Sequence, residues 1–169
     1  EPVTLDHIPA PNDAYGMSKY HAERQFLALE PEIEHRILRL GNLYGLSAQT
    51  RFDSLVNNMV LQAKYREKLL IQGSGSHARP IVPVAWAASK LIDAILNPPP
   101  SVEPIPVATE SISVEGVALT LSKSLPNTEI HYVNRAVDMP SLRLSEELHS
   151  GPDGQLLETQ IPSIIDRLI

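Results

Sequence analysis

Residues 13–45, DAYGMSKYHAERQFLALEPEIEHRILRLGNLYG, pass from a helical pattern into a strand pattern, and this change decides the fold class. Apolar residues recur at roughly helical spacing after an Asn-Asp pair that can cap a helix, and Pro31 stops the pattern. We therefore expect a long helix over 13–29. Residues 35–43 then alternate and run into a Tyr-Gly pair, which predicts a buried strand that ends in a loop.

The rest of the chain continues to alternate between the two kinds of element. We expect strands at 69–71, 80–84, 105–108 and 129–133, and helices at 52–66, 85–96, 113–125 and 161–169. Three prolines at 98–100 form a connector, and no internal repeat is present in the sequence. Alternating helices and strands at this spacing are typical of an α/β layer fold.

Composition excludes several classes of protein. The 169 residues are enough to bury a core without help. The absence of cysteine removes disulfides, thiolate nucleophiles and Cys-built zinc sites, and it favours a reducing cytoplasm. A net charge of −6 argues against a non-specific nucleic-acid binder, so a few placed arginines must hold any anionic ligand. No stretch reaches the roughly 18 apolar residues that a membrane helix needs.

Tyr15 and Lys19 lie four residues apart near the start of the first predicted helix, so both side chains leave the same face. An ammonium beside a phenol stabilises the phenolate form, which makes the phenol a usable proton donor and acceptor near neutral pH. The spacing alone also fits a solvated helix face.

Other chemical motifs in the sequence are weak. The six histidines show no pair at metal-ligand spacing, so we expect no metal site. Ser74 and Ser76 between glycines resemble a phosphate loop, but neither G-K-[ST] nor G-x-S-x-G is present, which argues against NTPases and hydrolases. We expect Trp86 to pack in the helix that it opens.

Four blocks occur in an order that resembles the extended short-chain dehydrogenase/reductases, the group of NAD-dependent epimerases, dehydratases and reductases of nucleotide sugars. The blocks are YGMSK at 15–19 with Glu23 following, RLGNLYG at 39–45, LLIQGSG at 69–75 with Arg79 following, and RAVDMPSLRL at 135–144. The last block is similar to the sugar-nucleotide reductase branch of dTDP-4-dehydrorhamnose reductases. Four ordered blocks are far more specific than any one motif.

The resemblance implies a catalytic role for two residues. Tyr15 would be the general acid/base that moves a hydroxyl proton during hydride transfer to or from NAD or NADP. Lys19 would hold the cofactor ribose and support the ionised Tyr15. In the family both residues therefore contact the cofactor.

The resemblance also implies binding roles. Leu40 and Gly41 would lie along the nicotinamide by backbone contacts, and Asn42 would donate to the substrate. Arg79 would clamp the diphosphate of a nucleotide sugar, because its forked donors match phosphate oxygens. The alternatives are that Asn42 is a turn residue and that Arg79 is a surface arginine.

The chain departs from the family pattern at its start. It opens Glu1-Pro2-Val3, and the glycine-rich turn that cradles a dinucleotide pyrophosphate in the family is absent from the sequence, as is a Ser or Thr two dozen residues before Tyr15. We expect the C-terminal half of such an enzyme, completed by an N-terminal half from the same gene product or from a second chain. The sheet at 35–43 would then show unpaired edges and bare apolar faces.

These features predict the C-terminal part of a Rossmann-like, doubly wound parallel sheet plus a small α/β substrate-binding region. Residues 1–100 would belong to the catalytic domain, and 101–169, interleaved with 45–85, to the substrate side. We expect a cytoplasmic homodimer formed through the first helix, with a nucleotide sugar as the small-molecule partner. The alternatives are a non-catalytic regulatory or scaffold subunit that kept the fold, and a stand-alone helical binding module.

Overall fold

The computed structural model of the chain describes residues 1–29, 34–99, 101–134, 140–151 and 156–168. Its helices are α1 (Ala14–Leu27), α2 (Leu55–Arg66), α3 (Val84–Leu96), α4 (Val114–Ser124), α5 (Leu157–Arg167) and the short 3₁₀ helix η1 (Glu146–Leu148). Its strands are β1 (Leu38–Leu40), β2 (Asn42–Tyr44), β3 (Lys68–Gln72), β4 (Ala78–Pro83), β5 (Ile105–Val107), β6 (Glu110–Ser113) and β7 (Glu129–Val133).

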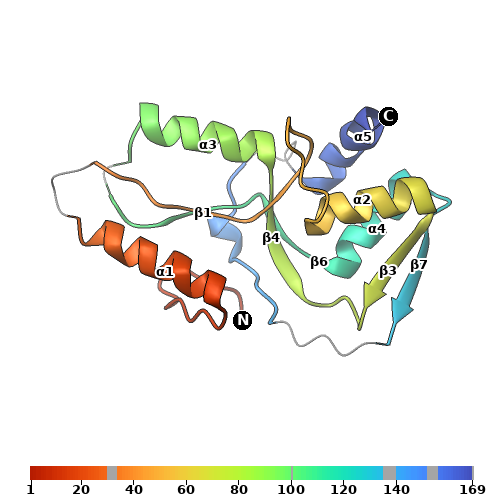
Figure 1. Cartoon of the computed structure of the whole chain (residues 1–169), viewed down its shortest axis with the longest axis horizontal. Coiled ribbons are helices and arrows are strands. Elements are labelled where there is room, and N and C mark those ends of the chain that lie inside the picture. Colours follow the sequence, from red (N-terminus) through yellow and green to blue (C-terminus); the bar gives the residue numbers. More distant parts are fainter. Residues whose placement is uncertain (30–33, 100, 135–139, 152–155, 169) are drawn as a thin grey trace.

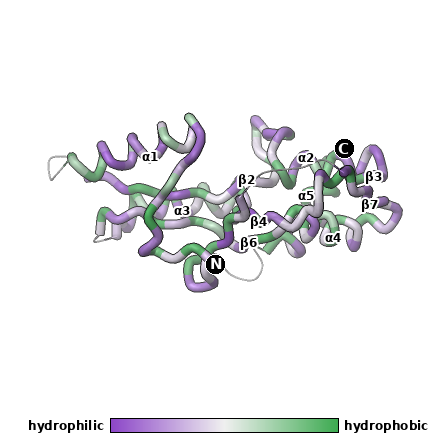
Figure 2. The backbone as a smooth tube through the Cα atoms, turned by 90° about the horizontal axis from the view of Figure 1, so that it is seen from below, coloured by the Kyte–Doolittle hydropathy of each residue, from purple (hydrophilic) through white to green (hydrophobic). Residues whose placement is uncertain are grey.

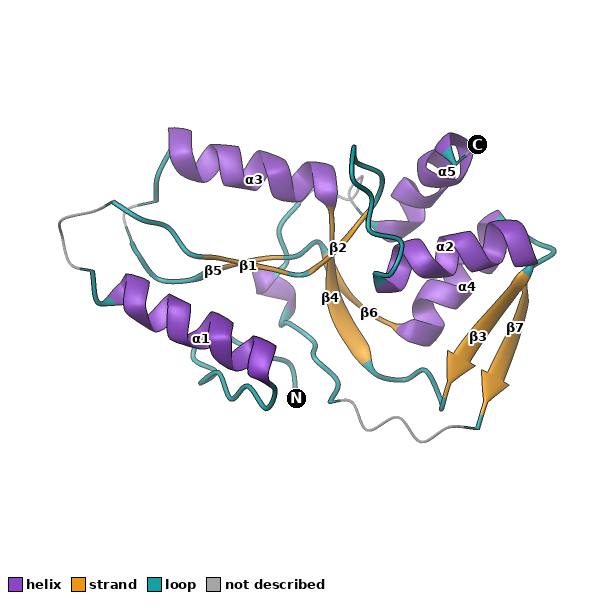
Figure 3. Ribbon diagram, in the orientation of Figure 1, coloured by secondary structure: helices purple, strands orange, loops and turns teal. Residues whose placement is uncertain are grey.

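The strands form three small sheets, and most of the pairs are parallel. β1 pairs with β5 and β3 pairs with β7, both in parallel. β4 lies between β2, which is parallel to it, and β6, which is antiparallel (Figure 3). Parallel strands joined by helices confirm the predicted α/β class. Among the described helices, none has the length and apolar character to cross a membrane.

The strand expected at 35–43 is where the structure differs most from the prediction. The chain changes partners at Gly41, so that β1 and β2 join two different sheets. β1 pairs with one strand and β2 with one strand among the described residues, so each is an edge strand, and Leu40 and Leu43 remain exposed. Since Tyr44 is the one buried residue of the two strands, the prediction of a buried strand is wrong for most of its length.

Two further elements, β6 and α5, differ from the prediction. Strand β6 was not expected, because its four residues become a strand by pairing with β4 rather than through an apolar alternation of their own. Helix α5 begins at Leu157 instead of 161, and Leu157, Ile161 and Ile164 form its buried stripe. Part of the RAVDMPSLRL block, residues 135–139, lies outside the described residues.

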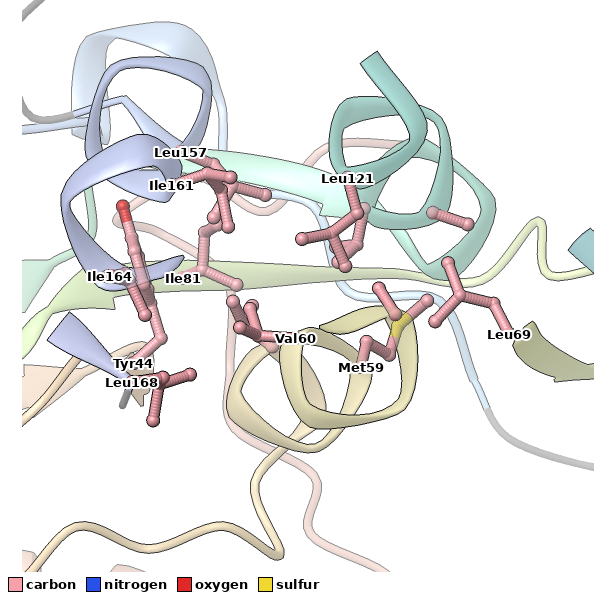
Figure 4. Packing of buried hydrophobic residues seen from close by; sticks show 14 of the residues in the cluster. Tyr44, Met59, Val60, Leu69, Ile81, Leu121, Leu157, Ile161, Ile164 and Leu168 are labelled. Atoms are coloured by element: carbon pink, nitrogen blue, oxygen red, sulfur yellow. The ribbon is translucent and has the colours of Figure 1, made fainter. Parts of the chain in front are cut away.

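The main core lies where α2, α4 and α5 pack over β3, β4 and β2. Figure 4 shows Ile81 of β4 between the helices, with side chains from all three helices around it. The labelled members of this cluster are Tyr44, Met59, Val60, Leu69, Ile81, Leu121, Leu157, Ile161, Ile164 and Leu168. This core fixes the end of β2 and with it the start of the loop that follows Tyr44.

The opposite end of the molecule carries α1 and α3, away from α2, α4 and α5 (Figures 1 and 2). α1 has no buried residue, and α3 buries Ala87, which packs with Val82 and Val107 in a second small cluster. Trp86, in the first turn of α3, packs against this cluster, and the Nζ of Lys90 lies 4.8 Å from the centre of its ring.

Candidate active site

The start of α1 sets the position of the predicted catalytic pair. The carboxylate of Asp13 caps the helix by accepting a hydrogen bond of 2.6 Å from the amide of Gly16. Tyr15 and Lys19 follow on one helix face, and the Nζ of Lys19 lies 5.4 Å from the centre of the Tyr15 ring. Tyr15 is 73% exposed, so its hydroxyl group is accessible to a ligand.

A two-bond ion pair ties α1 to β1. The guanidinium of Arg39 donates to both carboxylate oxygens of Glu23, at 2.9 Å and 2.5 Å. The hydrogen bond to Glu23 is the main reason that the pKa of Arg39 lies above its usual value. The first two sequence blocks, which contain Glu23 and Arg39, are therefore in direct contact.

Two neighbouring pockets lie on either side of the junction between β1 and β2. The tyrosine pocket, of about 740 Å³, is lined by Tyr15, Asn42 and the loop that follows β2. The lysine pocket, of about 610 Å³, is lined by Lys19 and the N-terminal segment. Leu40, Gly41, Pro80 and Leu142 line both pockets. Five of the six predicted site residues therefore surround one region.

Gly41 lies at the boundary between the two pockets, where the neighbouring backbone leaves no room for a side chain. A Cβ atom at this position would lie 2.9 Å from the carbonyl oxygen of Pro80. The amide of Gly41 donates to the carbonyl oxygen of Val107, which extends the β1 pairing by one residue. Packing against the neighbouring backbone thus requires the glycine.

Asn42 and Arg79 differ in their relation to the pockets. The Nδ2 of Asn42 lies 3.4 Å from the carbonyl oxygen of Pro80, and the residue lines the tyrosine pocket. Arg79 lines neither pocket, and its Nη1 donates to the carbonyl oxygens of Ala78 and Pro140 at 2.8 Å and 2.6 Å. The structure therefore does not bring Arg79 together with the other five residues.

The loop between β2 and α2 contributes polar groups that the sequence analysis did not assign to the site. Ser47, Gln49, Arg51 and Asp53 line the tyrosine pocket. Arg51 donates to both carboxylate oxygens of Asp53, at 3.1 Å and 2.7 Å, and this bonding lowers the pKa of Asp53. No sequence motif identifies these residues as part of a site. The one sequence signal for them is their position after the Tyr-Gly pair that ends a strand.

Tyr44 forms the base of the tyrosine pocket and is 1% exposed. Burial raises the pKa of its phenol well above the usual value, and the negative charge of Glu110 acts in the same direction. A hydrogen bond with Thr109 acts the other way. Tyr44 is therefore a neutral structural phenol, in contrast to the exposed Tyr15.

Within the described part of the chain, no group of three or more His, Asp or Glu side chains converges as a metal site would require.

The comparisons with known proteins concern the fold and the family. The fold is that of the Rossmann-like epimerases and dehydratases. The family model of the NAD-dependent epimerase/dehydratase family matches residues 1–98, and the chain belongs to that family. No curated protein sequence matches the chain.

Solved structures of the same fold are similar over nearly the whole chain. An NAD-dependent NDP-hexosamine 5,6-dehydratase of tunicamycin biosynthesis is 22% identical, with a TM-score of 0.77 over 98% of this chain and 56% of its own. The ADP-L-glycero-D-manno-heptose-6-epimerase of Helicobacter pylori is 17% identical, with a TM-score of 0.80 over 98% and 54%. The UDP-glucuronic acid 4-epimerase of Bacillus cereus, solved with UDP-glucuronic acid and NAD, is 19% identical, with a TM-score of 0.75 over 98% and 55%. The chain thus spans little more than half the length of these enzymes.

Proposed function

We propose that the chain carries the proton-transfer and substrate side of an NAD(P)-dependent epimerase, dehydratase or reductase that acts on a nucleotide sugar. The observation that carries this proposal is the position of Leu40 and Gly41, which line both pockets, with Tyr15 on one side and Lys19 on the other. A sugar in the tyrosine pocket and a nicotinamide riboside in the lysine pocket would meet at this boundary.

The lysine pocket fits one end of the cofactor. It offers an ammonium group, the Leu40–Gly41 backbone and about 610 Å³ of space, which suit a ribose and a nicotinamide ring. NAD(P), when bound, supplies the site with a hydride acceptor or donor at C4 of the nicotinamide. We propose NAD or NADP as the cofactor, because the residues that select between them in the family would belong to the glycine-rich half.

Tyr15 performs the proton chemistry in the proposed mechanism. Its ionised oxygen takes the proton of a sugar hydroxyl group. At the same time a hydride leaves the carbon that carries this hydroxyl group, so the alcohol becomes a carbonyl. In the reverse direction the same oxygen returns the proton. The ammonium of Lys19 lies 5.4 Å from the centre of the Tyr15 ring and would bond a ribose hydroxyl of the cofactor.

The substrate contacts follow from the remaining predicted residues. Asn42 would donate its amide to the sugar or a phosphate in the tyrosine pocket. Arg79 would bind the diphosphate after exchanging its hydrogen bond to the Pro140 carbonyl oxygen for phosphate oxygens, which guanidinium groups prefer. We propose that 101–169, together with 45–85, form this substrate side and that 1–100 carry the catalytic groups.

A glycine-rich segment would complete the dinucleotide site. The sequence contains no G-x-G-x-x-G turn, and the chain spans 54–56% of the three enzymes compared. We therefore propose that the chain corresponds to the C-terminal half of the family, and that the other half comes from the same gene product or from a second chain.

A homodimer in the cytoplasm completes the proposal. Helix α1 exposes Met17 and Phe26 and buries no residue, and Leu29 just beyond its end is also exposed, which suits a helix that packs against its copy. The absence of cysteine suits a reducing compartment.

The alternative is a regulatory or scaffold subunit that retains the fold without turnover. One experiment separates the two. Intact mass and N-terminal sequencing identify every polypeptide in the purified sample, and titrations with NADH and NADPH are followed by nicotinamide fluorescence. We expect a glycine-rich polypeptide and dinucleotide binding. A sample that holds this 18.6 kDa chain alone and binds neither dinucleotide contradicts catalysis by this molecule.

A further inference from the structure

The wall of the tyrosine pocket opposite α1 is an irregular loop. Residues 45–54 connect β2 to α2 and contain no regular secondary structure apart from turns. The loop starts at Gly45, whose φ of +103° is readily adopted only by glycine. A wall of this kind keeps its shape only if side chains satisfy its backbone groups.

Asn57 on α2 satisfies backbone groups at two points of this loop. Its Oδ1 accepts a hydrogen bond of 2.9 Å from the amide of Gly45, and its Nδ2 donates to the carbonyl oxygen of Gly45 at 3.3 Å. The same Nδ2 donates to the carbonyl oxygen of Arg51 at 3.0 Å. One side chain therefore holds together two points of the loop that lie six residues apart.

Asn57 is a buried residue, so its hydrogen bonds to the loop are part of the packed structure. It is 5% exposed and lies on the packed side of α2 beside Val56 and Val60. A buried amide is costly unless it is bonded, and here both its acceptor and its donor are used. It also lines the tyrosine pocket.

We propose that Asn57 is a positioning residue, which fixes residues 45–51 as the pocket wall that faces Tyr15. This inference rests on the proposed function, because the pocket is taken to bind a nucleotide sugar. The bonding pattern requires an amide. A carboxylate accepts from the Gly45 amide but donates to neither carbonyl oxygen, and an apolar side chain leaves all three groups unpaired.

The adjacent asparagine offers a matched control. Asn58 lies one position further along the same helix, is exposed, and accepts a hydrogen bond from Gln62 outside the tyrosine pocket. Asn57→Asp and Asn58→Asp therefore add the same charge at neighbouring positions, and only the first loses donors to the loop. Asn57→Ala removes these two bonds and also the bond from the Gly45 amide, without adding a charge, and it serves if Asn57→Asp does not fold.

Hydrogen–deuterium exchange of the complete protein, resolved by peptide, decides the proposal. We expect Asn57→Asp and Asn57→Ala to speed exchange in 45–51 by about tenfold while α4 and α5 exchange as before, and Asn58→Asp to leave the loop unchanged. Unchanged exchange in 45–51, or an equal increase throughout the core, overturns the proposal.

A parallel titration with UDP-glucose separates this inference from the proposed function. If the loop is the wall of a substrate site, the dissociation constant rises about tenfold in both Asn57 variants and stays the same in Asn58→Asp. If the wild-type protein binds no UDP-glucose, UDP-glucuronic acid or dTDP-glucose, the proposed function fails, whereas the exchange data still decide whether Asn57 holds the loop.

Discussion

Glu23 of α1 and Arg39 of β1 are joined by two nearly parallel hydrogen bonds, of 2.5 Å and 2.9 Å, across sixteen residues of sequence. Because α1 has no buried residue, apolar packing contributes little to holding this helix in place. The ion pair therefore fixes how α1 is placed along β1, and with it the position of Tyr15 and Lys19 beside the Leu40–Gly41 boundary.

A double-mutant cycle on this pair measures its strength. We expect Glu23→Gln and Arg39→Gln to show a coupling free energy of about 0.5 to 1 kcal/mol in urea unfolding, since the pair is bidentate but partly exposed. The pair between Arg51 and Asp53 has similar geometry but much greater exposure. It should show a clearly smaller coupling because water screens it, and equal coupling in the two pairs would contradict the role assigned to Glu23 and Arg39.

Gly41→Ala tests the tight contact at the boundary between the two pockets. The added methyl group would lie 2.9 Å from the carbonyl oxygen of Pro80, so the start of β2 and the neighbouring β4 must separate slightly. We expect a loss of about 1 to 3 kcal/mol in unfolding free energy, measured by urea denaturation at neutral pH. A variant as stable as the wild-type chain would show that the two backbones do not approach so closely.

Tyr44 predicts how stability changes at alkaline pH. Its folded-state pKa is raised, so the unfolded chain loses the phenolic proton near pH 10 while the folded chain keeps it. The stabilisation is therefore complete below pH 10 and is lost as the pH rises further, by up to about 1.4 kcal/mol per pH unit. We expect Tyr44→Phe to flatten the decline in unfolding free energy between pH 10 and 11.5. An unchanged slope would mean that Tyr44 ionises in the folded protein.

The proposed homodimer is tested on α1. Phe26→Glu places a charge on the exposed apolar side of this helix without disturbing any buried residue. Light scattering should find a molar mass corresponding to two copies of the protein for the wild type and one copy for the variant. A wild-type protein that stays monomeric at micromolar concentrations, or a variant that remains dimeric, contradicts an interface through α1.

Local signals in the sequence predicted most of the elements. The Asn-Asp pair, Ser113 and the apolar spacing located α1 and α4 closely, and Ser113 caps its helix by accepting from Gly116 as expected. Strand β6 was missed because its pairing with β4 is set by residues thirty positions away, which no local pattern records.

The candidate site shows the same contrast between residues that lie in local sequence motifs and residues whose role depends on contacts with distant parts of the chain. Tyr15, Lys19 and the segment at 40–42 belong to sequence blocks, and the structure gathers all five around the paired pockets. Asn57 was not predicted, because an amide beside an apolar helix stripe does not reveal which loop it will bond. Unpaired edges at 35–43 were expected, whereas the division of this strand into β1 and β2 depends on strand pairing and not on the alternation of its residues.

The central claim is that Tyr15 moves the proton. The most direct measurement compares turnover and binding in Tyr15→Phe, with the complete protein, NAD or NADP, and UDP-glucose, UDP-glucuronic acid or dTDP-glucose as substrates. Tyr132→Phe, on β7 and outside the lining of both pockets, is the control. We expect Tyr15→Phe to lower turnover by about 10² to 10⁴ while the dissociation constant of the sugar changes less than about threefold, and Tyr132→Phe to retain turnover. Turnover within a few-fold of wild type in Tyr15→Phe would contradict the account.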